Sequence, residues 1–163
     1  MASASNSDSS PPKAAASARR NEKAYMNYWI RAYDNRQYRV VDFIHDNGFI
    51  DWGMRNHLEK DDIVFLYATA PTSRITFAME VAKTSMTWKE TAEDSAYFLS
   101  QAHYDHWLAS RETKPYVRFS LLRELHSPYL TFHNLMQHGL GGAPRSPRRL
   151  QPEVVDYILA HFD

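Results

Sequence analysis

The segment MNYWIRAYD (residues 26–34) opens the part of the chain that decides the fold. Three further segments follow before Lys83: GFIDW (48–52), DDIVFLYA (61–68) and SRITFAMEVAK (73–83). Aromatic and β-branched residues are frequent in them, as is typical of strands. They contain no nucleophile motif, phosphate-binding loop or metal-ligand cluster. We therefore expect a small sheet with aromatic residues near its edges, which favours a binding pocket over a catalytic centre.

A strand is expected over Tyr25–Tyr33. Its alternation predicts one face with Tyr28, Ile30 and Ala32, and the other with Trp29, Arg31 and Tyr33. Asp34 and Gln37 have the spacing of a capping box and predict the start of a helix. Gly48 is placed to end that helix in the left-handed conformation. Residues 63–68 then form a continuous apolar run typical of a buried strand, and residues 75–81 are expected to pair back on it as a hairpin.

The second half of the chain alternates in the same mixed way. Thr91 and Asp94 predict a helix start, with the helix running toward Trp107. Residues 116–121 predict a half-buried strand, and residues 130–138 a short helix ended by Gly139. Pro152 opens a last helix at its favoured first position, with a buried face made of Val154, Tyr157, Ile158 and Phe162. This order predicts an α+β fold around a small, curved, partly closed sheet.

Composition sets the limits of these expectations. The 163 residues favour one domain, with residues 1–23 as a disordered tail of Ser, Ala and Pro and residues 24–163 as the folded part. The formal net charge is +0, which argues against a strongly electrostatic nucleic-acid coat. There is no cysteine, so disulfides and thiolate metal sites are excluded. No apolar run reaches the roughly 20 residues of a membrane span, and we expect a cytoplasmic protein.

Several segments in the same order resemble EVE domains. They are Tyr28-Trp29-Ile30, Asp51-Trp52, Lys60-Asp61-Asp62-Ile63-Val64, Ala78-Met79-Glu80-Val81, the Leu-rich residues 121–125 and the Pro-Arg segment 141–150. The resemblance extends over nearly all of residues 26–162. Asp61 stands where EVE domains usually have a glycine, at a turn.

The resemblance implies a PUA-like fold, shared with YTH and ASCH domains. This is a small β-barrel of five to six mixed strands with flanking helices. It also implies a pocket that holds one flipped base of DNA or RNA between aromatic walls. The base is expected to be modified, for example methylated or hydroxymethylated cytosine, or methyladenine. A restriction or RNA-modification system is the kind of partner implied. No cofactor, metal or enzymatic activity is expected.

By similarity with the YTH arrangement, Trp52 is the first candidate for a wall of such a pocket, and Trp29 is the second. Tyr67 lies at the end of its strand, where a side chain can face a pocket mouth, and Thr69 could bond a base edge. Tyr33, Asp34 and Asn35 follow the first strand and could read polar atoms. Burial in the core, or helix capping in the case of Asp34, is the alternative for these residues.

Positive charge is needed for the phosphates of a bound strand. Arg145, Arg148 and Arg149 lie in a Pro-rich loop with few acids nearby, and guanidinium groups suit phosphate. Arg19, Arg20 and Lys23 could add an arm from the tail. The alternative for all six is a solvated surface charge.

Two other classes of function stay open. A protein-interaction or self-associating module could use the aromatic stretch with Tyr97, Phe98, Tyr104 and Trp107. A metal-dependent hydrolase or nuclease could use His103, Asp105 and His106, but a zinc site normally takes three or four ligands, and no second paired motif is present. We expect neither a metal site nor catalysis.

Overall fold

The computed structural model describes residues 27–55 and 57–162. Its centre is a six-stranded mixed sheet in the order β2-β5-β4-β3-β1-β6. The strands are β1 (Tyr28–Tyr33), β2 (Phe49–Gly53), β3 (Ile63–Ala68), β4 (Arg74–Met86), β5 (Tyr116–Glu124) and β6 (Arg148–Arg149). The predicted tail, its boundary at residue 23 and the basic residues Arg19, Arg20 and Lys23 lie outside the described residues.

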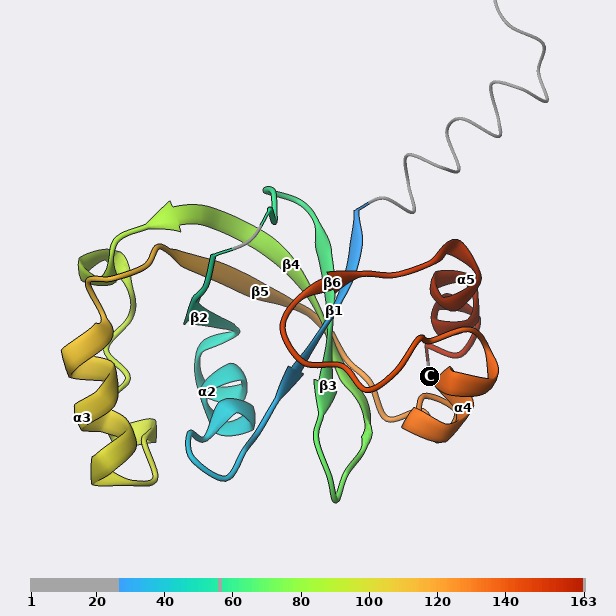
Figure 1. Cartoon of the computed structure of the whole chain (residues 1–163), viewed down its shortest axis with the longest axis horizontal. Helices are drawn as coiled ribbons and strands as arrows, with labels where there is room; N and C mark the ends of the chain where they lie inside the picture. Colours follow the sequence, from blue (N-terminus) through green and yellow to red (C-terminus); the bar gives the residue numbers. More distant parts are fainter. Residues whose placement is uncertain (1–26, 56, 163) are drawn as a thin grey trace, which may run out of the picture.

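In the described part of the chain, four α-helices flank this sheet: α2 (Val40–Asn47), α3 (Gln101–Ser110), α4 (Phe132–Gln137) and α5 (Pro152–Ala160). Two short 3-10 turns, η1 (Trp88–Glu90) and η2 (Ser95–Tyr97), precede α3. In Figure 1, α4 and α5 lie on the right of the sheet, α2 lies on the left, and α3 lies beyond β2 at the far left. The predicted α+β class with mixed strands is confirmed, although the two edge strands do not pair and the sheet stays open.

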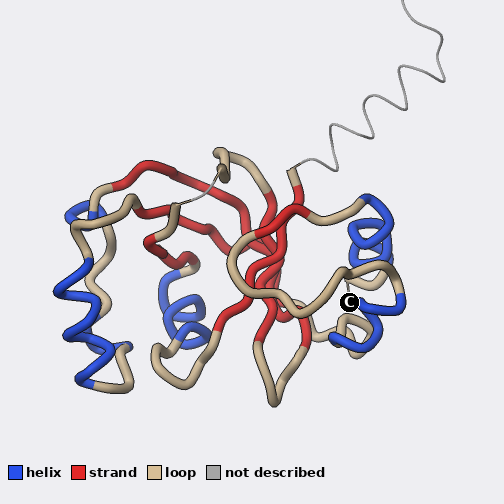
Figure 2. Tube along the Cα trace, in the orientation of Figure 1, coloured by secondary structure: helices blue, strands red, loops and turns tan. Residues whose placement is uncertain are grey.

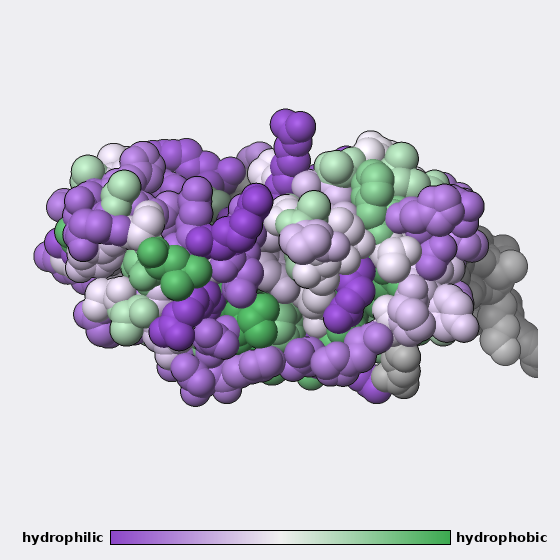
Figure 3. All heavy atoms as spheres, turned by 90° about the horizontal axis from the view of Figure 1, so that it is seen from below, coloured by the Kyte–Doolittle hydropathy of each residue, from purple (hydrophilic) through white to green (hydrophobic). Residues whose placement is uncertain are grey.

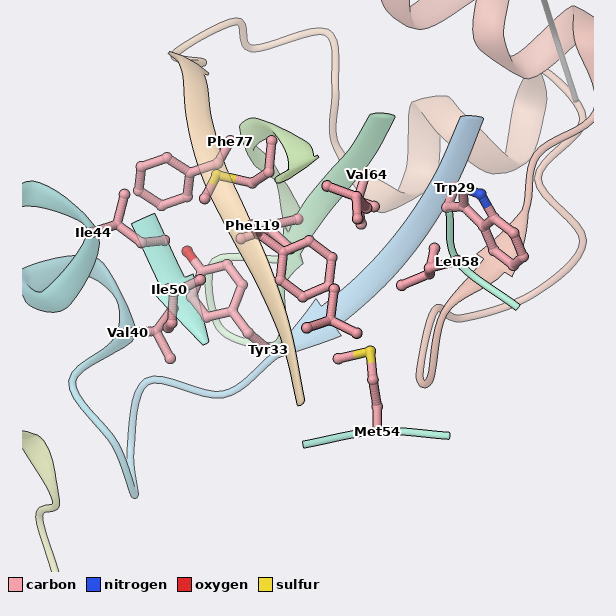
Figure 4. Close-up of a cluster of buried hydrophobic side chains, with 14 of the residues drawn as sticks. Trp29, Tyr33, Val40, Ile44, Ile50, Met54, Leu58, Val64, Phe77 and Phe119 are labelled. Atoms are coloured by element: carbon pink, nitrogen blue, oxygen red, sulfur yellow. The ribbon is translucent and has the colours of Figure 1, made fainter. Parts of the chain in front are cut away.

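The alternation predicted for the first strand is correct and divides the interior in two. Trp29 and Tyr33 belong to one buried cluster, which includes residues of α2, β2 and β5. Figure 4 shows this cluster around Phe77 and Phe119. Ile30 belongs to a second cluster, against which Tyr28 and Ala32 pack and which includes residues of α4 and α5. Each face of β1 therefore supplies a separate apolar layer.

β4 holds the sheet together because it pairs with both β3 and β5. It has 13 residues, and its pairing with β5 shifts register at three places. Such irregularities bend a strand and increase its twist. The red strands in Figure 2 cross at the centre of the molecule and diverge toward β2 and the end of β4. This divergence separates the strand ends on the side of the sheet near α3.

The predicted helix start at Asp34 is wrong. Asp34 bonds Arg36 instead, and α2 begins at Val40 with no side-chain cap. The cause is tertiary: Tyr38 forms a β-bridge with Phe98, and the Leu99 N–H donates to the Gln37 carbonyl at 2.8 Å. These contacts hold residues 37–38 out of the helix. The predicted end is confirmed, since Gly48 has φ 75° and its N–H donates to the Ile44 carbonyl.

The helix start predicted at Thr91 and Asp94 is also wrong. The Ser100 side chain caps α3 by accepting from the His103 N–H, and Asp94 precedes only the short turn η2. The last helix starts at Pro152 as predicted. Asp61, at the usual glycine position of the resemblance, has φ 76°, a conformation that aspartate tolerates better than most residues.

Among the described residues, no helix combines the length and the apolar character needed to cross a bilayer. Figure 3 shows the molecule from below, where hydrophilic residues predominate and apolar areas are small and separated.

Candidate functional site

A cavity of about 260 Å³ lies between α3 and the end of the sheet. We call it the Trp52 cavity. Five of its lining residues are aromatic, six carry an ionisable side chain, and two are small; they are Tyr38, Trp52, Phe98, Trp107 and Tyr116, then Arg31, Asp51, Asp94, His103, His106 and Lys114, then Gly53 and Ser110. A pocket of this size is smaller than the roughly 300–1,000 Å³ of drug-sized ligand sites. A ligand that it encloses would therefore be smaller than a drug-sized molecule.

The pairing of β2 with β5 positions the residues that form the inner wall of the cavity. Trp52 lies opposite Val117 in the β2–β5 pair, and Gly53 lies opposite Tyr116. The Trp52 ring packs edge-on against buried Phe119, with 5.6 Å between ring centroids. The core therefore holds the Trp52 ring in place, and the ring stays half-buried at the cavity.

Aromatic contacts outside the core form the outer wall. Phe98 makes an edge contact with Tyr38 at 4.9 Å and a tilted contact with Trp107 at 5.8 Å. Trp107 stacks beside Tyr104 at 5.9 Å. No residue of α3 is buried, so this helix is held by rings along the cavity rim and contributes nothing to the main core.

Arg31 is the central charged group of the cavity. Its guanidinium carbon lies 3.9 Å from the centroid of the Trp52 ring, a cation–π contact. One terminal nitrogen donates to the Ala32 carbonyl at 3.0 Å, but Nε is covered and has no hydrogen-bond partner among the described residues. Burial lowers the pKa of Arg31 to about 10, so it remains a cation at neutral pH. A buried donor without a partner costs roughly 1–3 kcal/mol, so Arg31 is held in this position at a cost to stability.

Asp94 supplies the cavity with an acidic group, in contrast to the Arg31 cation. Burial raises its pKa from 3.8 to about 6, so its carboxyl group changes protonation close to neutral pH. The Tyr38 hydroxyl donates to Asp94 at 2.9 Å. Burial, and then the Asp94 charge, raise the pKa of Tyr38, which keeps that phenol a neutral donor. The cavity thus offers a fixed cation and a carboxyl group that can accept or, once protonated, donate a hydrogen bond.

All the recorded hydrogen bonds of the Asp51 side chain are made to other parts of the fold. It accepts two hydrogen bonds from Arg118, at 2.8 and 3.0 Å, and a third from the Ala92 N–H at 3.0 Å. These bonds join β2 to β5 and to the segment after η1. Arg118 engages Asp51 in this bidentate pair, and Arg31 forms no ion pair with a carboxylate among the described residues.

Of the seven residues predicted for a base pocket, only Trp52 lines this cavity. Trp29 is buried in the core, where its indole N–H donates to Asp62 at 3.0 Å. Tyr67 is buried in the second cluster and packs against Phe132.

The other four predicted residues, Tyr33, Asp34, Asn35 and Thr69, line a hollow of about 140 Å³ at the ends of β1 and β3. Their polar groups are largely engaged. The Tyr33 hydroxyl bonds Thr76 at 2.8 Å, Asp34 bonds Arg36, and Asn35 accepts from the Val41 N–H.

The three arginines predicted to contact phosphate lie along and before β6, and none lines the Trp52 cavity. Arg148 donates to the carbonyls of Gly141 and Gly142. The Arg149 guanidinium lies 5.0 Å from the centroid of the Trp29 ring. Arg145 is exposed, and its carbonyl accepts from the Ala32 N–H.

Sequence reasoning missed Arg31, Tyr38 and Asp94 as site residues. An arginine within an otherwise apolar strand face could have drawn attention to Arg31. In the interaction-module alternative the aromatic stretch 97–107 supplies a contact surface, and two of its members, Phe98 and Trp107, line the cavity. His103 and His106 also line it, but the described residues hold no group of three or more His, Asp or Glu side chains suited to a metal ion.

No family model matches the sequence, and no curated protein is significantly similar to it. The structure is similar to ASCH from Zymomonas mobilis, with a TM-score of 0.62 and 12% identity, covering 85% of this chain and 97% of that one. It is also similar to a Pseudomonas syringae protein (0.55, 16%, covering 82% and 97%) and a Leishmania major protein (0.55, 16%, covering 82% and 92%). These likenesses concern the fold. They agree with the fold expected from the sequence, and they do not test the resemblance to EVE domains.

Proposed function

We propose that the protein binds a strand of nucleic acid by taking one extruded base into the Trp52 cavity. The observation that carries this proposal is the meeting of five aromatic side chains with a covered, unpartnered guanidinium N–H around one small cavity. Extruding a base costs a few kcal/mol, and stacking returns ~1–3 kcal/mol per base. Aromatic walls together with an unpaired donor suit that exchange.

Arg31 would meet the base directly. Its guanidinium lies over the Trp52 ring, so the base would stack on the guanidinium and not on that face of the ring, and bases do stack on guanidinium planes. The N–H groups of arginine pair with the oxygen and nitrogen acceptors of base edges. Asp94 and Tyr38 would read a second polar atom of the same edge.

The resemblance to EVE domains favours a modified base. A methyl group against an apolar wall is worth only ~1–3 kcal/mol, so methylation would be distinguished by the shape of the aromatic walls. A hydroxymethyl group would need a polar partner, which Asp94 offers. A restriction or RNA-modification system remains the kind of partner that the resemblance suggests.

Fluorescence-polarisation titration tests the proposal. Labelled single- and double-stranded DNA and RNA would carry an unmodified base, 5-methylcytosine, 5-hydroxymethylcytosine or N6-methyladenine at one position. We expect one modified strand to bind about tenfold or more tightly than its unmodified match, as one or two kcal/mol of added contact implies. Equal binding to every strand would contradict the proposal.

Two substitutions in α3 test whether the base binds in the Trp52 cavity. Trp107→Ala removes a cavity wall, and because α3 has no buried residue the fold should survive the change. Leu108→Ala alters the neighbouring position, where the side chain is 39% exposed and outside the cavity. We expect Trp107→Ala to lose the preference for the modified strand and Leu108→Ala to keep it. If both variants keep the preference for the modified strand, or both lose it, base recognition does not take place in this cavity.

A further inference from the structure

A second hollow adjoins the Trp52 cavity. It measures about 470 Å³ and lies between the end of β4, η1 and the segment after α3. Its cations are Lys89, Arg111 and Lys114, and we call it the basic groove. Lys114 lines both the basic groove and the Trp52 cavity. A smaller hollow of about 180 Å³ also connects them, sharing Trp88 and Arg111 with the first and Trp107 with the second.

Arg111 is built into the groove wall. Its guanidinium carbon lies 3.5 Å from the centroid of the Trp88 ring and 5.4 Å from that of Trp107. Its Nε is covered and, like that of Arg31, has no hydrogen-bond partner within residues 27–55 and 57–162. Stacking fixes the plane of the group, and because the side chain is half-buried its terminal N–H groups are the ones that can bind an oxyanion such as phosphate.

Lys114 is placed at the junction by a glycine. A Cβ at Gly53 would lie 2.6 Å from Lys114 Cε, so a larger residue there would displace the lysine. The Lys89 amino group lies 5.9 Å from the centroid of the Trp88 ring. Neither lysine, nor Arg111, forms an ion pair with a carboxylate in the described part of the chain. Of the described residues that line the groove, Glu112 is the one acid.

The loop arginines are placed differently. Arg148 is occupied by two carbonyls of its own loop and Arg149 covers Trp29, and neither adjoins the Trp52 cavity. We propose that the phosphates flanking the inserted base lie along the basic groove, bound by Lys89, Arg111 and Lys114. The inference rests on the proposed function, and it moves the backbone contact from the loop at residues 145–149 to the end of the sheet near α3.

The salt dependence of binding tests this placement. Each phosphate contact contributes about 0.7 to the slope of log K against log salt for a single strand. The probe is a labelled single-stranded oligodeoxynucleotide with one central 5-methylcytosine. We expect Lys89→Gln with Lys114→Gln to make the slope shallower by about 1.4. Lys60→Gln with Arg36→Gln removes the same charge from exposed sites elsewhere and should leave the slope unchanged.

Other outcomes are decisive. If Arg145→Gln with Arg149→Gln flattens the slope while the double-lysine variant keeps it, the groove is not the backbone site. An unchanged slope in every variant overturns the inference as well. If the wild-type protein shows no preference for any modified strand but the double-lysine variant still flattens the slope, the groove stands and the base-binding proposal fails. Circular dichroism of each variant confirms that the fold is retained.

Discussion

At the scale of single residues, Arg31 is the least expected feature of the molecule. A cation with a covered, unpaired N–H lies in a strand whose neighbours Ile30 and Tyr33 are buried. Such a group lowers stability, and proteins tend to retain destabilising groups at sites where function requires them. Arg31 should therefore matter more for binding than for folding.

Arg31→Met tests this separation. The methionine side chain can pack on Trp52 and has no donor to satisfy. We expect the free energy of unfolding, measured by urea denaturation, to stay the same or to rise by about 1 kcal/mol. Binding of the modified strand should weaken about tenfold or more. A variant that is less stable but binds normally would show that Arg31 supports the fold.

The raised pKa of Asp94 predicts that the stability of the fold depends on pH. Its pKa in the folded protein, about 6, lies above the ordinary value of 3.8, chiefly because of burial. The folded state therefore holds the proton more tightly, and the ionised carboxyl costs stability above about pH 6. That cost disappears as the pH falls through about 6 toward 4.

The comparison with Asp94→Asn isolates this effect. Asparagine stays neutral, so we expect the variant to be more stable than the wild-type protein at about pH 7 to 8, with the difference shrinking below about pH 6. Urea denaturation of both proteins across this range measures it. A difference that does not vary with pH would refute the role assigned to the Asp94 proton.

At the scale of elements, α3 differs from α2 in what holds it. α2 buries Val40, Phe43 and Ile44, whereas α3 buries no residue and rests on rings at the cavity rim. Segments with few buried apolar contacts open locally at low free energy. We expect the amides of α3 to exchange hydrogen much faster than those of α2, and to be protected when a modified strand binds. Equal protection of the two helices without ligand would contradict this.

The end of α2 gives a stability prediction. Gly48 has φ 75°, and a Cβ added there would meet no heavy atom within 4 Å, so Gly48→Ala would suffer only backbone strain. We expect a loss of about 1–2 kcal/mol in the free energy of unfolding. Gly141→Ala is the matched control, because its surroundings are equally open and its φ is not left-handed. The prediction fails if both variants lose the same stability.

At the scale of the whole molecule, local pattern was enough for most of the fold. The alternation of β1, the hairpin of β3 and β4 and the glycine at the end of α2 all follow from short stretches of sequence. Residues 37–38 meet residues 97–99, and each of these segments lies between the predicted and the observed start of its helix. That contact joins segments about sixty residues apart, so it cannot be predicted from the spacing of residues within either segment.

The candidate site was harder to predict for the same reason. Trp52 could be singled out, but the cavity exists only because β1, β2, β5 and α3 meet at the open end of the sheet. Arg31 becomes a cavity residue through its position beside Trp52. The predicted pocket residues Tyr33, Asp34, Asn35 and Thr69 do cluster, but around another hollow. A sequence supplies candidate side chains, and strand pairing decides which of them meet.

The most direct test of the account uses the indole N–H resonances of the four tryptophans in a two-dimensional ¹⁵N–¹H NMR titration with the preferred modified strand. Trp52 and Trp107 line the cavity, whereas Trp29 is buried and bonded to Asp62. We predict that the signals of Trp52 and Trp107 shift on binding and that the Trp29 signal stays in place. Binding that leaves Trp52 and Trp107 unshifted would contradict a base-binding role for the cavity.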